Sequence, residues 1–326
     1  MSEPKTKLPE VIVLGRPAVF KYYGEELSQK FRLLKPWESS LPLEQFICTH
    51  AESVQAMICS PKNIGSQLSS SLLRLLPSLR FIVTTSTGVD HIDVVECRRR
   101  GISVASAATI FSEDVADFAV GLLIDVLRKI SAADKFVKNG LWPLRGDFPL
   151  TSKVGSRKVG IVGLGSIGLK VAKRLEAFGC IISYVSRKKK PVCYPFYPDV
   201  HELATRCDVL VICCALTDQT RHLINKEVLL SLGRAGVIIN IARGAIINEV
   251  ELVQCLNQGE IAGAGLDVFD NEPNVPEELF SLGNVVLTRH VAFHTEDSFR
   301  AIYELICGNL EAFFLNQPLL SPVFDD

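Results

Sequence analysis

The sequence predicts a parallel α/β protein built from two α/β units, and three observations lead to this expectation. Short runs rich in β-branched and apolar residues alternate with helical stretches along the chain. The alternation stops in a turn-rich stretch, residues 139–153, and then restarts. The length of 326 residues corresponds to about two domains. Such a chain is long enough to bury sizeable cores.

The first third of the chain contains the strands and helices of the first unit. β-rich runs predict strands at 11–14, 56–59, 81–85 and 103–105. Helices are expected near 24–31, 65–76 and 92–99. A long helix follows at about 112–130, because Val115, Phe118, Leu122 and Val126 recur at helical spacing and give it one buried face.

The second unit begins after the turn-rich stretch. Its strands are predicted at 158–162, 181–185, 209–213, 237–241, 263–268 and 285–287. A final helix is expected at about 296–315. Two α/β units in one chain suggest a ligand-binding cleft between them.

Composition excludes several classes of protein. The 35 Lys and Arg residues nearly balance 36 Asp and Glu residues, for a net charge of -1. A nucleic-acid-binding protein should be basic, and anionic membranes also attract basic surfaces. With 48% hydrophobic and 22% charged residues, the chain has the composition of an ordered globular protein. We therefore expect neither nucleic-acid nor membrane partners.

Targeting and cysteine signals point to the cytoplasm. The most apolar run, 115–127, is interrupted by two aspartates, whereas a membrane span needs about 20 apolar residues. The N-terminal MSEPKTKLPE resembles neither a secretory signal nor a transit peptide, and SPVFDD is not a peroxisomal address. The ten cysteines form no CxxC pair. We expect reduced, mostly buried thiols and no metal site.

A glycine motif predicts dinucleotide binding. The strand at 158–162 leads into Gly163-Leu164-Gly165-Ser166-Ile167-Gly168, and a helical stretch follows. In this setting Gly163 allows a tight turn, Gly165 lets a pyrophosphate approach the backbone, and Gly168 allows close packing of helix and strand. A purely structural turn is the alternative, but both flanks favour a dinucleotide site.

The end of the next strand indicates which dinucleotide binds. An acidic residue at this position would bind the ribose 2′-hydroxyl of NADH. This chain instead has Ser186-Arg187-Lys188, where a hydroxyl, a planar guanidinium and an ammonium suit a 2′-phosphate. We therefore expect NADPH as the cofactor, with NADH binding more weakly. The alternative is a solvated basic loop.

Three later segments each offer a reactive side chain near a strand end. They contain Arg243 in NIARG, Glu272 in GLDVFDNEP and His290 in LTRHV. Ligands bind at the carboxyl ends of strands in open α/β sheets. An arginine there could clamp a carboxylate and polarise the neighbouring carbonyl. Taken singly, a histidine or a Glu-Pro pair is more often structural.

Together these motifs resemble the D-2-hydroxyacid dehydrogenase family over nearly the whole chain. The resemblance includes TTSTGVDHID at 84–93, SEDVADFAVGLL at 112–123 and NGLW at 139–142. Residues 207–220 and 233–253 are most similar to the plant NADPH-dependent glyoxylate, hydroxypyruvate and hydroxyphenylpyruvate reductases. The resemblance implies a Rossmann-type dinucleotide-binding domain, a smaller flavodoxin-like substrate domain and a homodimer.

The resemblance also implies roles for individual residues. His290 would be the general acid for the keto oxygen, Glu272 would favour its protonated form, and Arg243 would bind the keto acid and stabilise the developing charge. The backbone N–H groups of Thr87 and Gly88 would hold the substrate carboxylate. The remaining implied contacts are Asp267, Ile241 and Ala242 at the nicotinamide, and Trp142 near the substrate mouth.

The implied reaction is reduction of small 2-keto acids, hydroxypyruvate to D-glycerate and glyoxylate to glycolate. Arg289 replaces the usual proline, Ala292-Phe293 replaces a small Gly-Ser pair, and His294 follows. These departures leave hydroxyphenylpyruvate open as the substrate. A dinucleotide-sensing corepressor on the same scaffold is a further alternative. The expected domains are 107–294 for NADP and 1–106 with 295–326 for substrate.

Overall fold

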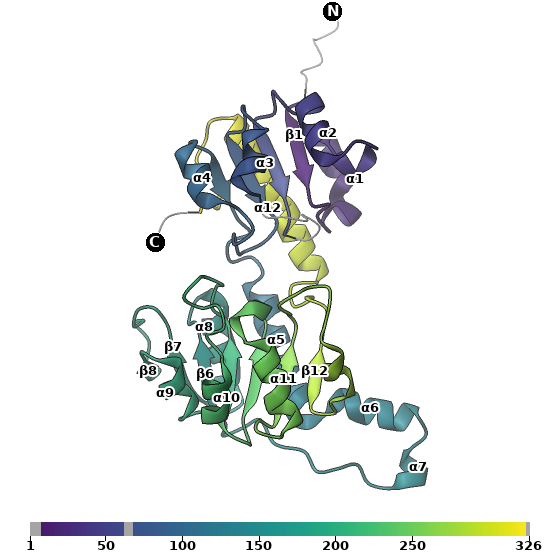
Figure 1. Cartoon of the computed structure of the whole chain (residues 1–326), viewed down its shortest axis with the longest axis vertical. Coiled ribbons are helices and arrows are strands. Elements are labelled where there is room, and N and C mark those ends of the chain that lie inside the picture. Colours follow the sequence, from purple (N-terminus) through teal and green to yellow (C-terminus); the bar gives the residue numbers. More distant parts are fainter. Residues whose placement is uncertain (1–7, 62–67, 324–326) are drawn as a thin grey trace, which may run out of the picture. The chain divides into compact units, whose positions relative to one another are not determined.

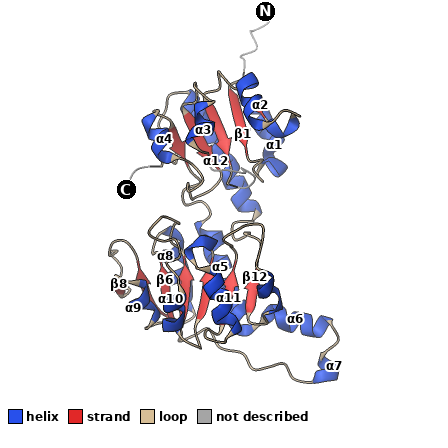
Figure 2. Cartoon of the chain, viewed as in Figure 1, coloured by secondary structure: helices blue, strands red, loops and turns tan. Residues whose placement is uncertain are grey.

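The computed structural model describes residues 8–61 and 68–323 (Figure 1). Its contacts divide the chain into two compact units. Met1–Phe111 and Thr295–Asp326 form the first, and Ser112–His294 form the second. Each unit contains one sheet, and helices pack against it (Figure 2). The prediction of a parallel α/β fold is confirmed.

The second unit is a seven-stranded parallel sheet in the order β12-β11-β10-β9-β6-β7-β8. Its strands are β6 (Lys158–Val162), β7 (Ile181–Val185), β8 (Phe196–Tyr197), β9 (Val209–Ile212), β10 (Val237–Asn240), β11 (Gly263–Leu266) and β12 (Val285–Leu287). The helices are α5 (Ser112–Arg128), α6 (Ile130–Lys138), α7 (Trp142–Arg145), α8 (Ser166–Ala177), α9 (Val200–Ala204), α10 (Lys226–Leu232) and α11 (Glu249–Asn257). Single 3-10 turns lie at Gly244–Ile246 and Glu277–Ser281.

The strand order creates a switch point beside β6. The chain continues from β6 to β7 and β8 on one side, then crosses to β9 and β10 on the other. This is the arrangement of Rossmann folds, in which the ligand binds where the strand order reverses. Continuous apolar strands suit it because both faces are covered: β9 and β10 are fully buried, α5 contacts β10 and β11, and α9 contacts β6.

The first unit is a five-stranded parallel sheet in the flavodoxin-like order β2-β1-β3-β4-β5. Its strands are β1 (Glu10–Leu14), β2 (Arg32–Leu34), β3 (Ala56–Cys59), β4 (Phe81–Thr84) and β5 (Ser103–Ala105). Its helices are α1 (Phe20–Lys30), α2 (Leu43–His50), α3 (Ser70–Arg74), α4 (Val94–Arg99) and α12 (Glu296–Phe314), with a 3-10 turn at Pro36–Glu38.

The last helix completes the first unit. α12 contacts β4, and the Phe313 ring stacks on Phe81 at 5.0 Å between centroids. The segment after it forms a bridge between Pro322 and Ala105 of β5. The buried Asn309 amide fixes this return, because its oxygen accepts the backbone N–H of Leu320 at 3.0 Å. The prediction of a final helix near 296–315 is therefore confirmed.

Several predicted boundaries are wrong. The helix expected at 112–130 ends at Arg128, because Lys129 adopts a left-handed backbone with φ +52°. Asp125 stabilises this break by accepting the backbone N–H of Ser131 at 2.8 Å, so a second helix starts at Ile130. The short edge strands β2 and β8 and the helices α2 and α7 were not predicted, and α9, α10 and α11 were expected only as part of the general α/β alternation. Part of the helix expected at 65–76 lies outside the described residues.

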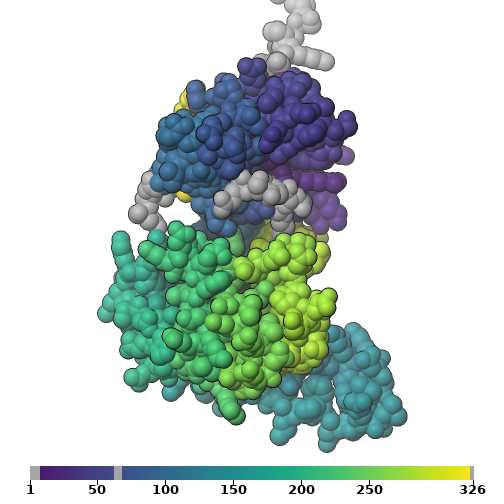
Figure 3. All heavy atoms as spheres, viewed as in Figure 1, coloured from purple at the N-terminus to yellow at the C-terminus, as the bar shows by residue number. Residues whose placement is uncertain are grey.

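Helices α6 and α7 extend away from the sheet of their own unit (Figure 1). The same segment stands out from the rest of the unit in the space-filling view (Figure 3). It presents large apolar side chains to solvent: Val137 is 54% exposed, Trp142 63% and Leu144 78%. Exposed apolar side chains grouped on one segment indicate an interaction surface. We call residues 130–150 the arm.

All ten cysteines are free thiols. Burial raises the pKa of Cys59 to about 12 and that of Cys214 to about 11, so both stay protonated at neutral pH. Protonated buried thiols are poor nucleophiles and poor metal ligands. Among the helices in the described part of the chain, none is both long and apolar enough to cross a membrane.

Candidate active site

The turn between β6 and α8 has the form that a dinucleotide requires. Gly163 has φ +96°, and a Cβ there would lie 2.6 Å from the backbone nitrogen of Cys214. A Cβ on Gly168 would lie 2.3 Å from the carbonyl oxygen of Gly163. A Cβ on Gly165 would instead meet nothing within 4 Å. The first and third glycines thus permit close packing, and the second leaves the room that a pyrophosphate needs at the helix N-terminus.

The first turn of α8 contributes Ser166 and Ile167. The Ser166 hydroxyl donates to the Ser112 hydroxyl at 2.8 Å and so ties α8 to α5. Ile167 is half-buried. Both residues therefore line the start of the helix beside the glycine turn.

The basic loop after β7 has a fixed shape. The Ser186 hydroxyl donates to the carbonyl oxygen of Lys188 at 2.6 Å. The fully buried Tyr184 phenol accepts the backbone N–H of Lys190 at 2.7 Å. Arg187 and Lys188 are exposed on this loop. A 2′-phosphate would therefore meet cations on an ordered backbone.

Asn240, at the end of β10, shapes the turn that carries Arg243. Its side-chain oxygen accepts the backbone N–H of Ala242 at 3.0 Å, and its amide nitrogen donates to the Arg243 carbonyl at 2.9 Å. The residue is 1% exposed, so this amide is satisfied inside the protein. Ile241, also buried, lies within the same turn. Asn240 has no predicted role, although it lies at a predicted strand end just before the arginine.

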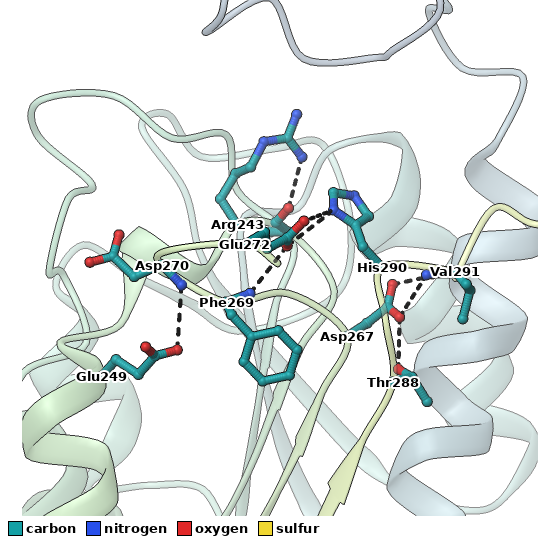
Figure 4. A network of polar contacts seen from close by, with 11 residues as sticks. Arg243, Glu249, Asp267, Phe269, Asp270, Glu272, Thr288, His290 and Val291 are labelled. Carbon is teal, nitrogen blue, oxygen red and sulfur yellow. Dashed lines mark hydrogen bonds and ion pairs between the residues drawn. The ribbon is translucent and has the colours of Figure 1, made fainter. Parts of the chain in front are cut away.

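Arg243 is brought next to the loop after β11 by a glycine. A Cβ on Gly244 would lie 1.9 Å from the backbone of Phe269, so only glycine allows this approach. The Arg243 guanidinium also donates to the Ala242 carbonyl at 2.8 Å. Figure 4 shows Arg243 beside Glu272 as a result.

His290 and Glu272 form a pair at this edge of the sheet. His290 Nδ1 lies 2.9 Å from one Glu272 oxygen and 3.1 Å from the other (Figure 4). One of these oxygens also accepts the backbone N–H of Phe269 at 3.2 Å. The side chains are 22% and 31% exposed, so the pair is accessible to a ligand. Because a carboxylate only accepts hydrogen bonds, Nδ1 carries a hydrogen. Nε2 is then the ring nitrogen that can exchange a proton with a ligand.

Asp267 holds the loop that carries His290. Its fully buried carboxylate accepts the Thr288 hydroxyl at 2.7 Å and the backbone N–H groups of Val291 at 2.8 Å and Ala292 at 3.0 Å. These donors lie on both sides of His290, whose φ is +58°. A left-handed backbone is uncommon for non-glycine residues, and these hydrogen bonds support it here. Thr288 is a second positioning residue that sequence reasoning missed.

The departures from the family pattern lie next to this histidine. The Phe293 ring meets the His290 ring edge-on, with 6.2 Å between centroids. Arg289 and His294 are exposed on the same loop. These side chains place an aromatic ring and a cation beside the general-acid candidate.

A protein-family model decides the identification. The model of the D-isomer specific 2-hydroxyacid dehydrogenase NAD-binding domain matches residues 120–292. The chain belongs to the D-isomer specific 2-hydroxyacid dehydrogenase family. The matched range contains the glycine turn, Arg243, Glu272 and His290. The resemblance seen in the sequence is thereby confirmed.

The chain aligns with relatives in the family over almost its whole length. A glyoxylate/hydroxypyruvate reductase of Arabidopsis thaliana is 52% identical and aligns over 97% of each chain. A hydroxyphenylpyruvate reductase of Plectranthus scutellarioides is 45% identical over 93% of this chain and 95% of its own. The solved NADPH-dependent glyoxylate/hydroxypyruvate reductase of Sinorhizobium meliloti, in complex with NADP and malonate, has a TM-score of 0.89 at 35% identity, covering 97% and 96% of the two chains.

Other site residues expected for this dehydrogenase family lie on separate elements. Thr87 and Gly88 follow β4 in the first unit, and Thr87 is exposed. Within the described residues, the backbone N–H groups of Thr87, Gly88 and Val89 have no hydrogen-bond acceptor. Three successive N–H groups in a loop suit an anion. Trp142 is the first residue of α7, on the arm.

Proposed function

We propose that the protein reduces small 2-keto acids with NADPH, converting hydroxypyruvate to D-glycerate and glyoxylate to glycolate. The observation that carries this proposal is the His290–Glu272 pair beside Arg243, at the edge of a sheet that also carries the dinucleotide turn. The names of the plant and bacterial relatives support the substrate class.

His290 acts as the general acid in this proposal. Glu272 holds Nδ1, so Nε2 is the atom that gives a proton to the keto oxygen of the substrate. Arg243 binds the keto acid and stabilises the negative charge that develops on that oxygen. Bound NADPH supplies the hydride. The N–H groups of Thr87 and Gly88 hold the substrate carboxylate.

The cofactor contacts follow from the glycine turn and the basic loop. Gly163, Gly165, Ser166, Ile167 and Gly168 surround the pyrophosphate. Ser186, Arg187 and Lys188 bind the 2′-phosphate, and they lie on a loop whose hydrogen bonds already fix its shape. Ile241 and Ala242 line the nicotinamide pocket. We also assign Asp267 to this pocket, although its carboxylate is fully buried in this structure and supports the His290 loop.

The second candidate substrate is 4-hydroxyphenylpyruvate, which is larger than glyoxylate or hydroxypyruvate. The edge of Phe293 against His290 would either narrow the pocket for two- and three-carbon acids or stack on an aromatic substrate. A steady-state comparison of glyoxylate, hydroxypyruvate, pyruvate and 4-hydroxyphenylpyruvate with NADPH separates these possibilities. We expect the highest kcat/KM for hydroxypyruvate or glyoxylate. A higher value for hydroxyphenylpyruvate would make the protein an aromatic keto-acid reductase.

We assign the cofactor to residues 107–294 and the substrate-binding loop to residues 1–106 with 295–326. This assignment places every proposed cofactor contact in the seven-stranded sheet unit and Thr87 and Gly88 in the five-stranded one. We also infer a cytoplasmic location, because ten free cysteine thiols suit a reducing compartment. Fractionation of tagged full-length protein tests that inference.

We propose a homodimer formed through the nucleotide-binding units, with the arm at the interface. The exposed Trp142 and Leu144 side chains would then be buried against the partner, and Trp142 would lie near the partner's substrate mouth. Light scattering at micromolar concentration should give twice the chain mass. Leu144→Asp should shift the protein toward the monomer, whereas Val95→Asp, at a similarly exposed apolar residue of the other unit, should not. A wild-type monomer would contradict the proposal.

A corepressor-like dinucleotide sensor remains the alternative from another class. It shares the scaffold but needs no turnover. The His290–Glu272 pair favours the enzyme, because an accessible imidazole held by a carboxylate is the arrangement that general acid catalysis needs. Failure to oxidise NADPH with any 2-keto acid would favour the sensor.

A further inference from the structure

The loop proposed to hold the substrate carboxylate is tied to a buried histidine by a chain of hydrogen bonds. His91 is 8% exposed, and its Nε2 lies 3.0 Å from the hydroxyl of the fully buried Thr84. That hydroxyl lies 3.0 Å from the Ser86 hydroxyl. The Ser86 hydroxyl in turn donates to the carbonyl oxygen of Gly88 at 2.7 Å. The chain therefore runs from the core of the first unit to the loop.

The Gly88 carbonyl oxygen, at the end of this series of hydrogen bonds, determines which group donates in each of them. A carbonyl oxygen only accepts, so the single Ser86 hydrogen is committed to Gly88. Ser86 must then accept the Thr84 hydrogen, and Thr84 must accept from His91. His91 therefore carries its hydrogen on Nε2. Cys59, 3.9 Å from the same nitrogen, is a neutral thiol because burial raises its pKa to about 12.

Fixing the Gly88 carbonyl also sets the direction of a neighbouring donor. The peptide between Gly88 and Val89 is trans, and in a trans peptide the C=O and the following N–H point in opposite directions. Because Ser86 holds the Gly88 carbonyl, the Val89 N–H points away from this series of hydrogen bonds. The Ser86 carbonyl accepts the Ala107 N–H at 2.9 Å, which anchors the start of the loop as well.

We propose that His91 is a positioning residue that, through Thr84 and Ser86, orients the N–H groups of Thr87, Gly88 and Val89 toward the substrate carboxylate. This inference rests on the proposed function, in which that loop holds the carboxylate. It adds Val89 as a donor and gives the buried histidine a role in substrate affinity. His91 does not touch the reacting atoms.

The test compares His91→Leu, which removes the donor, with His91→Gln, which keeps an N–H at a similar position. We expect His91→Leu to raise KM for glyoxylate about 10-fold, as for the loss of one buried hydrogen bond. The kcat value and the Kd for NADPH should change less than about 3-fold, and His91→Gln should restore most of the affinity. Calorimetry of the NADPH-loaded enzyme with oxalate should show the same pattern without turnover.

Ser86→Ala provides the matched variant, because it cuts the last link and leaves His91 in place. It should weaken oxalate binding as much as His91→Leu does. The variant with both substitutions should bind oxalate no more weakly than the weaker-binding of the two single variants. Ser86→Ala decides the question if His91→Leu does not fold. Unchanged oxalate affinity in folded Ser86→Ala protein, or additive losses in the double variant, would overturn the proposal. A wild-type protein that binds oxalate but reduces no keto acid would instead refute the proposed function.

Discussion

Replacing His290 with alanine is expected to lower kcat for hydroxypyruvate by about 10²- to 10⁴-fold, the usual contribution of a positioned general acid. The keto oxygen would lose its proton donor, and Glu272 would lose the imidazole that it holds at 2.9 Å. NADPH affinity should stay nearly intact, because the glycine turn and the basic loop are unaffected. Stopped-flow single turnover and NADPH fluorescence titration measure the two effects separately.

His201→Ala is the matched control for this variant. His201 is an exposed histidine whose Nε2 lies 2.8 Å from the Ser231 hydroxyl in the same unit. Its removal should leave kcat unchanged. If His290→Ala retained more than about one tenth of the wild-type kcat, a value outside the range expected for a general acid, His290 would not be the proton donor.

Replacing Arg187 with alanine is expected to weaken NADPH binding by about 10- to 100-fold, because charged hydrogen bonds to the 2′-phosphate are lost. NADH lacks that phosphate, so its Kd should change less than about 3-fold. Direct fluorescence titration with both cofactors gives the two values. The variant protein would therefore lose most of its preference for NADPH.

Lys189→Ala is the control, since Lys189 is an exposed cation on the same loop with no proposed contact. It should lower NADPH affinity only slightly, through the general field of the loop. Equal losses of NADPH and NADH affinity in Arg187→Ala would mean that the arginine stabilises the loop and does not recognise the phosphate.

Much of the fold was predictable because its signals are local in sequence. Parallel strands buried on both faces are continuous apolar runs, so β9, β10 and the other central strands were found close to their observed limits. The edge strands β2 and β8 have three and two residues and lack such a signal. The helix break at Lys129 depends on the Asp125 side chain capping the next helix, which periodicity does not reveal.

The residues of the proposed site also divide into those with a local sequence signal and those without one. Arg243, Glu272 and His290 were found because each lies near a strand end in a recognisable motif. The positioning residues Asn240 and Thr288 were missed, and Asp267 was predicted only as a cofactor contact. All three act through contacts that form only after the strands align. His290 itself has a left-handed backbone, which is uncommon for non-glycine residues and is not predicted by the sequence. The role that we propose for His91 depends on a chain of hydrogen bonds that cannot be read from spacing alone.

The most direct test of the proposed function is product formation by the purified wild-type protein with hydroxypyruvate and NADPH. We expect one D-glycerate to form for each NADPH oxidised, with a higher kcat/KM for NADPH than for NADH, and glyoxylate to give glycolate in the same way. Absence of NADPH oxidation with both acids, in protein that binds NADPH and is folded, would contradict it.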